Sequence, residues 1–155
     1  MQVVKYPILI IVIAQLFGTS LWFSANSAAP NLMHTWGITE ADIGRLSNAV
    51  QLGFIVGTLT FSLSGLADRF EASRIFTVFA VLGAIANGVF AVGADSLNSA
   101  LPLRFAVGFC LAGVYPLGMM LVVSWAPDRA GHALAQLLGM LTLGTALPHG
   151  IRFIG

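Results

Sequence analysis

Long apolar runs separated by short polar segments dominate this sequence. The runs at residues 46–67 and 75–94 contain no Asp, Glu, Lys or Arg. Each is long enough to cross a hydrocarbon core of about 30 Å, which takes about 20 helical residues. The runs are apolar on every side, whereas barrel strands alternate in polarity, so they predict membrane-spanning helices.

The same pattern predicts five spans in one domain covering residues 1–155, at about 6–28, 43–66, 75–93, 97–125 and 132–153. The predicted fold class is therefore all-α, a polytopic integral membrane helix bundle. The first apolar run is longer than the 7 to 15 residues of a typical secretory signal, which favours a retained span. It should stop before Pro30, and a polar stretch follows. Thr39 and Asp42 have the spacing of a capping box at the start of the second span.

Composition narrows the function classes. The chain is 57% hydrophobic and 8% charged, against about 25% charged in soluble domains, which excludes a soluble globular protein. The net charge of +1 comes without a basic run, so no nucleic-acid partner is expected. The sequence contains no catalytic or nucleotide-binding motif and no histidine spacing suited to a metal, so we expect no cofactor and no enzymatic activity. Cys110 lies in an apolar run and is predicted to be a small core residue.

The distribution of Lys and Arg over the short loops predicts the orientation, because cytoplasmic loops carry more of them. A cytoplasmic N-terminus places Lys5, Arg69, Arg74 and Arg129 inside, with Arg45 and Arg152 outside. We therefore expect a multi-pass protein of the plasma or inner membrane, with its N-terminus in the cytoplasm.

Small residues recur at the spacing that lets membrane helices approach closely. The second span carries Gly53 and Gly57, and the fourth carries Gly108 and Ala112. Further candidates for helix packing are Ala80, Ala84 and Gly88 in the third span, and Gly144 and Pro148 in the fifth.

Arg104 is the charged residue that lies farthest from the ends of a predicted span. Arginine at a span centre costs about 2.5 to 3.5 kcal/mol on insertion scales. One interpretation is that the side chain extends to the membrane surface. The other is that it faces a polar cavity, where it binds an anion or pairs with a carboxylate. Arg104, Gly108, Ala112 and Pro116 share one stripe of the helix, and such a stripe suits close packing or a cavity better than lipid.

The charged turn at residues 64–74 carries the clearest motif. Its sequence SGLADRFEASR places Gly65, Asp68, Arg69 and Arg74 between two spans. It resembles the loop between spans two and three of the major facilitator superfamily of secondary transporters. Ser64 stands where that family's pattern has its first Gly, and Glu71 where it has the second.

Three further segments are similar to the same family. Arg104 with Gly108 matches a pattern of its fourth span, and residues 36–44 resemble the entry to its second span. Residues 144–148 are only loosely similar to a Gly and Pro pattern that antiporters carry in the fifth span.

The resemblance implies a protein of twelve helices in two halves, which transports a small solute by alternating access. Spans one and four would line the cavity, so it implies Trp22, Asn26, Arg104 and Tyr115 as solute or coupling candidates, and Gln51 is a polar candidate in the second span. Asp68 and Arg69 would belong to a cytoplasmic charge network that latches one conformation.

Five spans are fewer than this layout requires. We therefore expect these residues to be the N-terminal part of a longer transporter, which needs its second half or a partner chain within the bilayer. Proton coupling is one option for driving transport. The alternative function is a small, non-transporting membrane subunit or scaffold of a larger complex.

Overall fold

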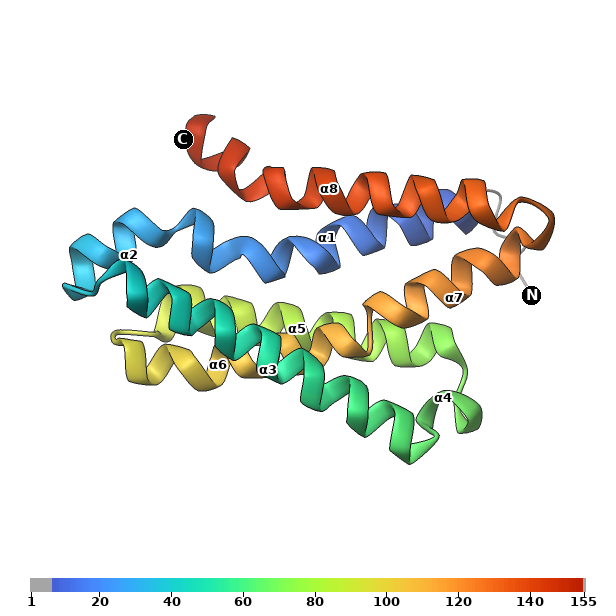
Figure 1. Cartoon of the computed structure of the whole chain (residues 1–155), viewed down its shortest axis with the longest axis horizontal. Helices are drawn as coiled ribbons and strands as arrows, with labels where there is room; N and C mark the ends of the chain where they lie inside the picture. The colour runs from blue at the N-terminus through green and yellow to red at the C-terminus, as the bar shows by residue number, and fades with distance from the viewer. Residues whose placement is uncertain (1–6, 155) are drawn as a thin grey trace.

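A computed structural model describes residues 7–154 of the chain, except for the side chains of residues 67, 147–149, 151, 152 and 154. Lys5 and the side chains of Pro148 and Arg152 therefore lie outside the described residues. The regular structure within them is helical (Figure 1), namely α1 (Pro7–Ser27), α2 (Ala29–Trp36), α3 (Glu40–Ser64), α4 (Leu66–Arg69), α5 (Ala72–Gly93), α6 (Leu97–Ala112), α7 (Tyr115–Trp125), the 3-10 turn η1 (Pro127–Arg129) and α8 (Ala130–Ile154).

The predicted all-α polytopic bundle is confirmed. Four helical stretches in the described part are long and apolar enough to cross a membrane, Pro7–Ser27, Glu40–Ser64, Ala72–Gly93 and Leu97–Trp125. Their ends lie within about one turn of the first four predicted spans. The fifth predicted span coincides with α8, a helix of 25 residues that packs along α1.

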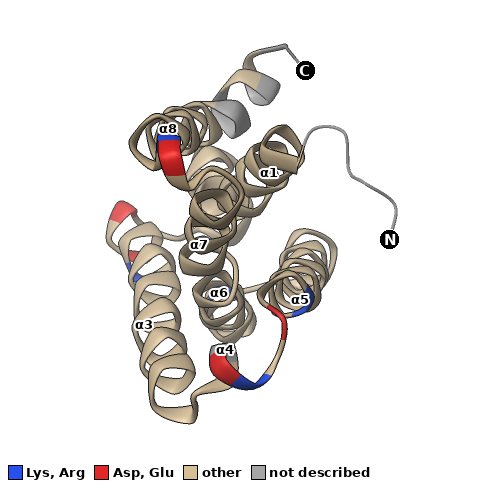
Figure 2. Cartoon of the chain, turned by 90° about the vertical axis from the view of Figure 1, so that its right-hand side faces the viewer, with Lys and Arg blue, Asp and Glu red and all other residues tan. Residues whose placement is uncertain are grey.

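The long helices run back and forth along one axis of an elongated bundle (Figure 1). The most extensive contacts join α3 to α6, α1 to α8 and α5 to α6. In the end view of Figure 2, α6 and α7 stand between α3, α5 and α1, so this pair is the centre of the bundle. Apart from Arg104 in α6, the charged residues of the described part lie near helix ends or in the connections, which is what a hydrocarbon environment requires.

Both ends of α3 follow from local sequence signals. At its start, the Thr39 N–H donates a hydrogen bond to Asp42 Oδ2 over 3.0 Å, which completes the predicted capping box. At its end, Gly65 has a φ of +59°, a left-handed conformation that favours glycine. The predicted charged turn therefore starts at Gly65 and contains the short helix α4.

Two segments differ from the sequence prediction. The polar stretch after Pro30 folds as α2, because Pro30 sits in the first turn, where its missing N–H costs nothing. The fourth predicted span is not continuous but breaks into α6 and α7 at Gly113 and Val114. Pro116 explains the break, since it has no N–H to bond the carbonyl of Ala112 one turn earlier.

The α3–α6 contact depends on small residues. A Cβ added to Gly53 would overlap the carbonyl oxygen of Phe105, and one added to Gly108 would overlap the carbonyl oxygen of Val50. A Cβ on Gly57 would lie 2.7 Å from the Cβ of Ala112. The two backbones therefore touch directly over about two turns, from Val50 to Gly57 and from Phe105 to Ala112.

Not every small-residue repeat marks an interface. In α5, Gly88 is exposed and a Cβ added there would meet no atom within 4 Å, so its predicted packing role is wrong. The reason is that α5 meets α6 on another face, where Gly83 approaches Cys110. Cys110 itself is buried and free, in agreement with its predicted core position.

We predict that Gly108→Ala destabilises the protein, whereas Gly88→Ala does not. Overpacking a tight contact costs about 1 to 3 kcal/mol, and removing a mid-helix glycine otherwise gains about 1 kcal/mol. Thermal unfolding in detergent should therefore show a lower Tm for Gly108→Ala and an equal or higher Tm for Gly88→Ala. Equal shifts for both variants would contradict the direct backbone contact.

Candidate functional site

Arg104 is fully buried in α6, where it faces α1 and α5. Its guanidinium carbon lies 5.2 Å from the centre of the Phe90 ring, which is a cation–π distance. The side chain does not extend along the bundle surface, so the interpretation that it reaches the lipid–water interface is wrong.

The guanidinium is held by acceptors from two other helices. Nη1 donates to Ser24 Oγ and Asn87 Oδ1, each over 2.9 Å. Nη2 donates to the backbone carbonyl oxygens of Leu21 over 3.1 Å and Trp22 over 2.8 Å. Ser24 Oγ also lies 2.6 Å from Asn87 Oδ1, so the side chains form one network across α1, α5 and α6.

The network engages all the N–H groups on Nη1 and Nη2 of the guanidinium. Arginine has five N–H donors, and the four on Nη1 and Nη2 are engaged here, while Nε has no partner. The acceptors are neutral, and no carboxylate among the described residues is paired with this arginine. In this conformation Arg104 therefore holds three helices together. Its Nη donors are not available to a solute.

Two other predicted cavity residues share a pocket. Trp22 and Tyr115 line a cavity of about 240 Å³ between α1, α3, the α6–α7 break and α8, together with Thr19, Phe23, Phe54, Leu111 and Leu141. The Trp22 ring packs edge-to-face on Phe54, with 5.3 Å between the ring centres. Arg104 does not line this pocket.

Asn26 and Gln51 do not line this pocket, but each lies one turn from a residue that does, Asn26 from Trp22 and Gln51 from Phe54. Asn26 is exposed on α1, and its Oδ1 accepts a hydrogen bond of 2.9 Å from Ser47 Oγ on α3. Gln51 is one turn after Ser47 on α3 and is also exposed. The structure thus places Trp22 and Tyr115 in one pocket, with Asn26 and Gln51 next to pocket residues on the same helices and Arg104 outside it.

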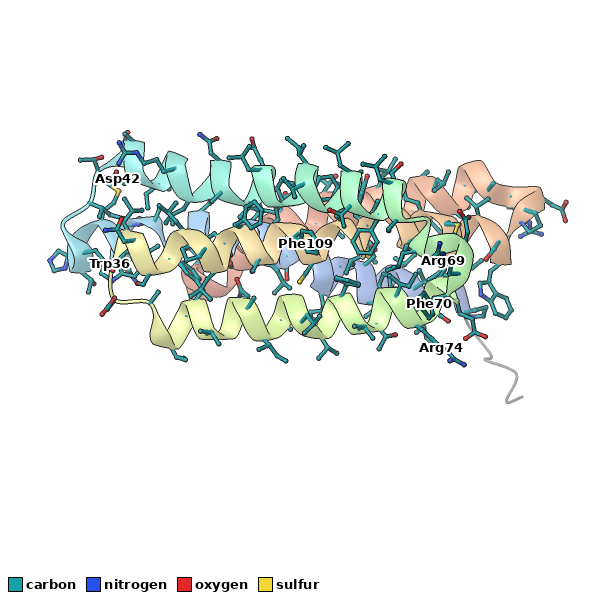
Figure 3. All side chains as sticks on the ribbon, turned by 90° about the horizontal axis from the view of Figure 1, so that it is seen from below. Trp36, Asp42, Arg69, Phe70, Arg74 and Phe109 are labelled. Carbon is teal, nitrogen blue, oxygen red and sulfur yellow. The ribbon has the colours of Figure 1, made fainter. Side chains whose placement is uncertain are left out.

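The charged turn does not form the predicted network within the described residues. Arg74 Nε pairs with Glu71 Oε2 at 2.8 Å, and both side chains are largely exposed. Asp68 is exposed and has no ion-pair partner in the described part of the chain. Figure 3 shows Arg69 and Arg74 together at one end of the bundle, opposite the end that holds Asp42 and Trp36.

The sequence analysis missed Asn87 and Ser24, although a signal for Asn87 was present. Asn87 carries an amide inside the charge-free run of α5, where a polar group needs a hydrogen-bond partner. Its partner, Arg104, lies 17 residues later. Ser24 gives no comparable signal, because serine is common in membrane helices and often bonds its own backbone.

Asp95 is the ionisable group at the connection between α5 and α6. Hydrogen bonds from the Ser99 and Ser96 hydroxyls, each over 3.0 Å, lower the pKa of this exposed carboxyl group below its usual value of 3.8. The charged form of Asp95 therefore stabilises the start of α6. This stabilisation of the folded state is fully present above pH 3.8 and is lost as the pH falls through the lowered pKa.

Comparison with known proteins agrees with the arrangement of these helices and motifs. The model of the Major Facilitator Superfamily matches residues 11–147. The chain belongs to the Major Facilitator Superfamily. With four apolar helical stretches long enough to cross a bilayer, it is a multi-pass membrane protein.

Two curated members of the family are similar to part of the chain. The 4-hydroxybenzoate transporter PcaK of Pseudomonas putida is 32% identical over 101 residues, which are 65% of this chain and 22% of that protein. The protein of the same name in Pseudomonas aeruginosa is 30% identical over 109 residues, again 65% of this chain and 22% of the relative. The chain thus spans about a fifth of the length of these relatives. No solved structure matches it.

We predict that Arg104→Lys lowers the Tm even though it keeps the charge. A lysine ammonium has three donors, so at least one of the four acceptors loses its partner, and a hydrogen bond to a charged group contributes about 1.5 to 3 kcal/mol. Unfolding of the purified protein in detergent measures the effect.

Two substitutions of Asn87, to Asp and to Leu, test the same network at one of its acceptors. We expect Asn87→Asp to keep or raise the Tm, because a carboxylate there would pair with the guanidinium that lies 2.9 Å from the present amide oxygen. Asn87→Leu should lower the Tm, because it leaves Arg104 without that acceptor. A loss for the Asp variant as large as for the Leu variant would contradict the proposed geometry.

Proposed function

We propose that the chain is the N-terminal part of a secondary transporter that moves a small solute across a membrane by alternating access. The observation that carries the proposal is the family match, which extends over residues 11–147 and so over most of the described helices. The second half, supplied by the rest of the protein or by a partner chain, would close the solute site. The alternative of a non-transporting subunit or scaffold receives no support from the comparisons.

The proposed solute site lies on the side of the bundle that carries Trp22, Asn26, Gln51 and Tyr115. The pocket shared by Trp22 and Tyr115 supports this assignment, because α1 and the fourth span both contribute to its walls, and these are the spans that the family resemblance implies for the solute cavity. We assign Arg104 a different role. It fixes α6 to α1 and α5, so that these helices move together.

The curated relatives suggest the first solute to test. Both are named for 4-hydroxybenzoate, a small aromatic acid. An aromatic carboxylate is therefore our first candidate substrate. The acidic residues in the described part lie at helix ends or in connections, so a proton-carrying group buried in the membrane would belong to the rest of the protein.

We propose that the N-terminus is cytoplasmic and that the protein lies in the plasma or inner membrane. Arg69, Arg74 and Arg129 support this orientation, because α4, the start of α5 and the connection from α7 to α8, which carry them, lie at the end of the bundle where α1 begins (Figure 1). Arg45 lies at the other end, where it pairs with Asp42 at 2.9 Å.

Transport by the native-length product is the direct test. The protein would be reconstituted in liposomes and supplied with radiolabelled 4-hydroxybenzoate, with and without an imposed pH gradient. We expect accumulation above protein-free liposomes, and a dependence on the gradient would identify proton coupling. Absence of uptake, followed by absence of uptake for a wider panel of small organic and inorganic solutes, would contradict the transporter proposal.

We predict that Asp68→Asn slows transport without lowering the Tm. Asp68 is exposed and unpaired in the described part, so its charge has little to contribute to the stability of this bundle. A slower rate would then report a contact that Asp68 makes elsewhere in the transport cycle.

Glu71→Gln is the matched control, because it removes a carboxylate from the same turn that is already paired with Arg74 at the exposed surface. Exposed pairs contribute only about 0 to 1 kcal/mol, so this variant should transport at nearly the normal rate. Normal transport by Asp68→Asn would show that Asp68 does not belong to a latch.

A further inference from the structure

Gln15 is a buried amide without a hydrogen-bond partner. It lies in α1 with no exposed surface, and neither Nε2 nor Oε1 has a partner among the described residues. Leaving a buried polar group unpaired costs about 1 to 3 kcal/mol, and in native structures such groups are nearly always satisfied. The position therefore points to a partner that the chain itself does not supply.

The amide lies against the first turn of α7. A Cβ added to Gly118 would overlap Gln15 Oε1, so the amide occupies the space left by the missing side chain. The first N–H groups of a helix have no acceptor within it, and they carry a partial positive charge. At the start of α7, Pro116 has no N–H and the Gly118 N–H donates to the carbonyl oxygen of Val114 over 2.8 Å, so the positive end consists of the N–H groups of Tyr115 and Leu117. The break at Gly113 and Val114 places this helix start inside the bundle, and Gln15 is packed against it.

This amide is one layer away from the aromatic pocket. Helices α1 and α7 run in opposite directions (Figure 1), and Thr19 and Tyr115 both line the pocket. Gln15 precedes Thr19 by four residues, and Gly118 follows Tyr115 by three. With a rise of 1.5 Å per residue, the two steps are about 6 Å and about 4.5 Å toward the same end of the bundle. Gln15 and Gly118 therefore form the next layer below the pocket.

The pocket itself has the size and walls for one ring. Its walls are four aromatic side chains, two leucines and Thr19, and its volume is about 240 Å³. An apolar cavity of about 150 Å³ holds benzene, so this one has room for a substituted ring. The Thr19 hydroxyl donates to the carbonyl oxygen of Gln15 over 2.8 Å, so its proton is already engaged. Gln15 does not line the pocket, but it lies one turn before Thr19 on the same helix, and its Nε2 and Oε1 have no partner among the described residues.

We propose that the pocket binds the ring of a small aromatic carboxylate, and that the carboxylate points toward Gln15 and the first turn of α7. This inference rests on the proposed transport function and names the substrate class and the residues that select it. The ring would replace water against Trp22, Phe54 and Tyr115. The carboxylate would accept a hydrogen bond from Gln15 Nε2, close to the positive end of α7. Gln15 is a specificity-determining residue in this arrangement.

The test is equilibrium binding to the native-length product, with three probes. 4-Hydroxybenzoate has the aromatic ring, the hydroxyl and the carboxylate. Phenol keeps the ring and the hydroxyl but lacks the carboxylate, and cyclohexanecarboxylate has the carboxylate on a ring that is neither aromatic nor hydroxylated. We expect the wild-type protein to bind 4-hydroxybenzoate most tightly.

Two substitutions separate the two parts of the site. Gln15→Met keeps the side-chain length but removes the amide. It should weaken 4-hydroxybenzoate binding about tenfold, which corresponds to one hydrogen bond of about 1.4 kcal/mol. The affinity for phenol should not change. Phe54→Leu should weaken 4-hydroxybenzoate and phenol about threefold to tenfold and leave cyclohexanecarboxylate unchanged. Phe61→Leu is the matched control, because Phe61 is on the same helix but packs on Phe79 and Phe109, away from the pocket, so it should change none of the three affinities.

Thermal unfolding of Gln15→Met provides a second readout. Removing an unpaired buried amide should keep or raise the Tm, so a loss of binding in a protein that is at least as stable assigns Gln15 to the solute. Unchanged binding with a raised Tm would overturn the assignment and leave Gln15 as a packing residue or a partner of a bound water.

The wider outcomes distinguish this inference from the proposed function. Transport of a solute without an aromatic ring, with no binding of the three probes, would overturn the inference and leave the transporter proposal standing. Binding with the expected variant pattern but without translocation would support the site and contradict transport.

Discussion

The bundle depends on one buried cation. Arg104 carries its charge into the interior of an apolar protein, and four hydrogen bonds to α1 and α5 offset the cost of burying it. Two of the acceptors are backbone carbonyls of α1, which can accept a second hydrogen bond because each oxygen has two lone pairs. Moving α1 or α5 away from α6 would leave a guanidinium in hydrocarbon without acceptors, so these three helices are fixed relative to one another.

The contact between α6 and α3 follows a different rule. Among the described residues no side-chain hydrogen bond joins these two helices, and the contact depends on Gly53, Gly57 and Gly108, which let the two backbones touch. A helix that is joined to two neighbours by hydrogen bonds and to a third by direct backbone contact has little freedom to rotate or slide. The constraint stops at Gly113 and Val114, where the fourth span breaks. Beyond the break, α7 takes its own direction, and the aromatic pocket opens at that point.

The sequence was sufficient for the spans but not for the network. Charge-free runs have a length that the bilayer thickness dictates, and the capping box at Thr39 and the glycine at position 65 mark helix ends through local chemistry, so these features are readable from neighbouring residues. The partners of Arg104 are not, because Ser24 is 80 residues away and the two α1 acceptors are backbone atoms, which any residue type would supply. The break in the fourth span was readable from Pro116. The unpaired state of Gln15 becomes visible only when every neighbouring helix is in place.

The two groups of charges in this chain suit different tasks in a transport cycle. A conformational change requires contacts that differ in free energy between two states, and these contacts must be exchangeable at moderate cost. Arg104 does not meet this condition, because losing even one of its acceptors leaves a buried charge less well solvated. Asp68 and Arg69 meet it, because exposed charges at a helix end exchange a partner for water at little cost. In the proposed alternating-access cycle the helices around Arg104 would therefore move as one rigid body, and the contacts that form and break would be those at the helix ends that carry Asp68 and Arg69.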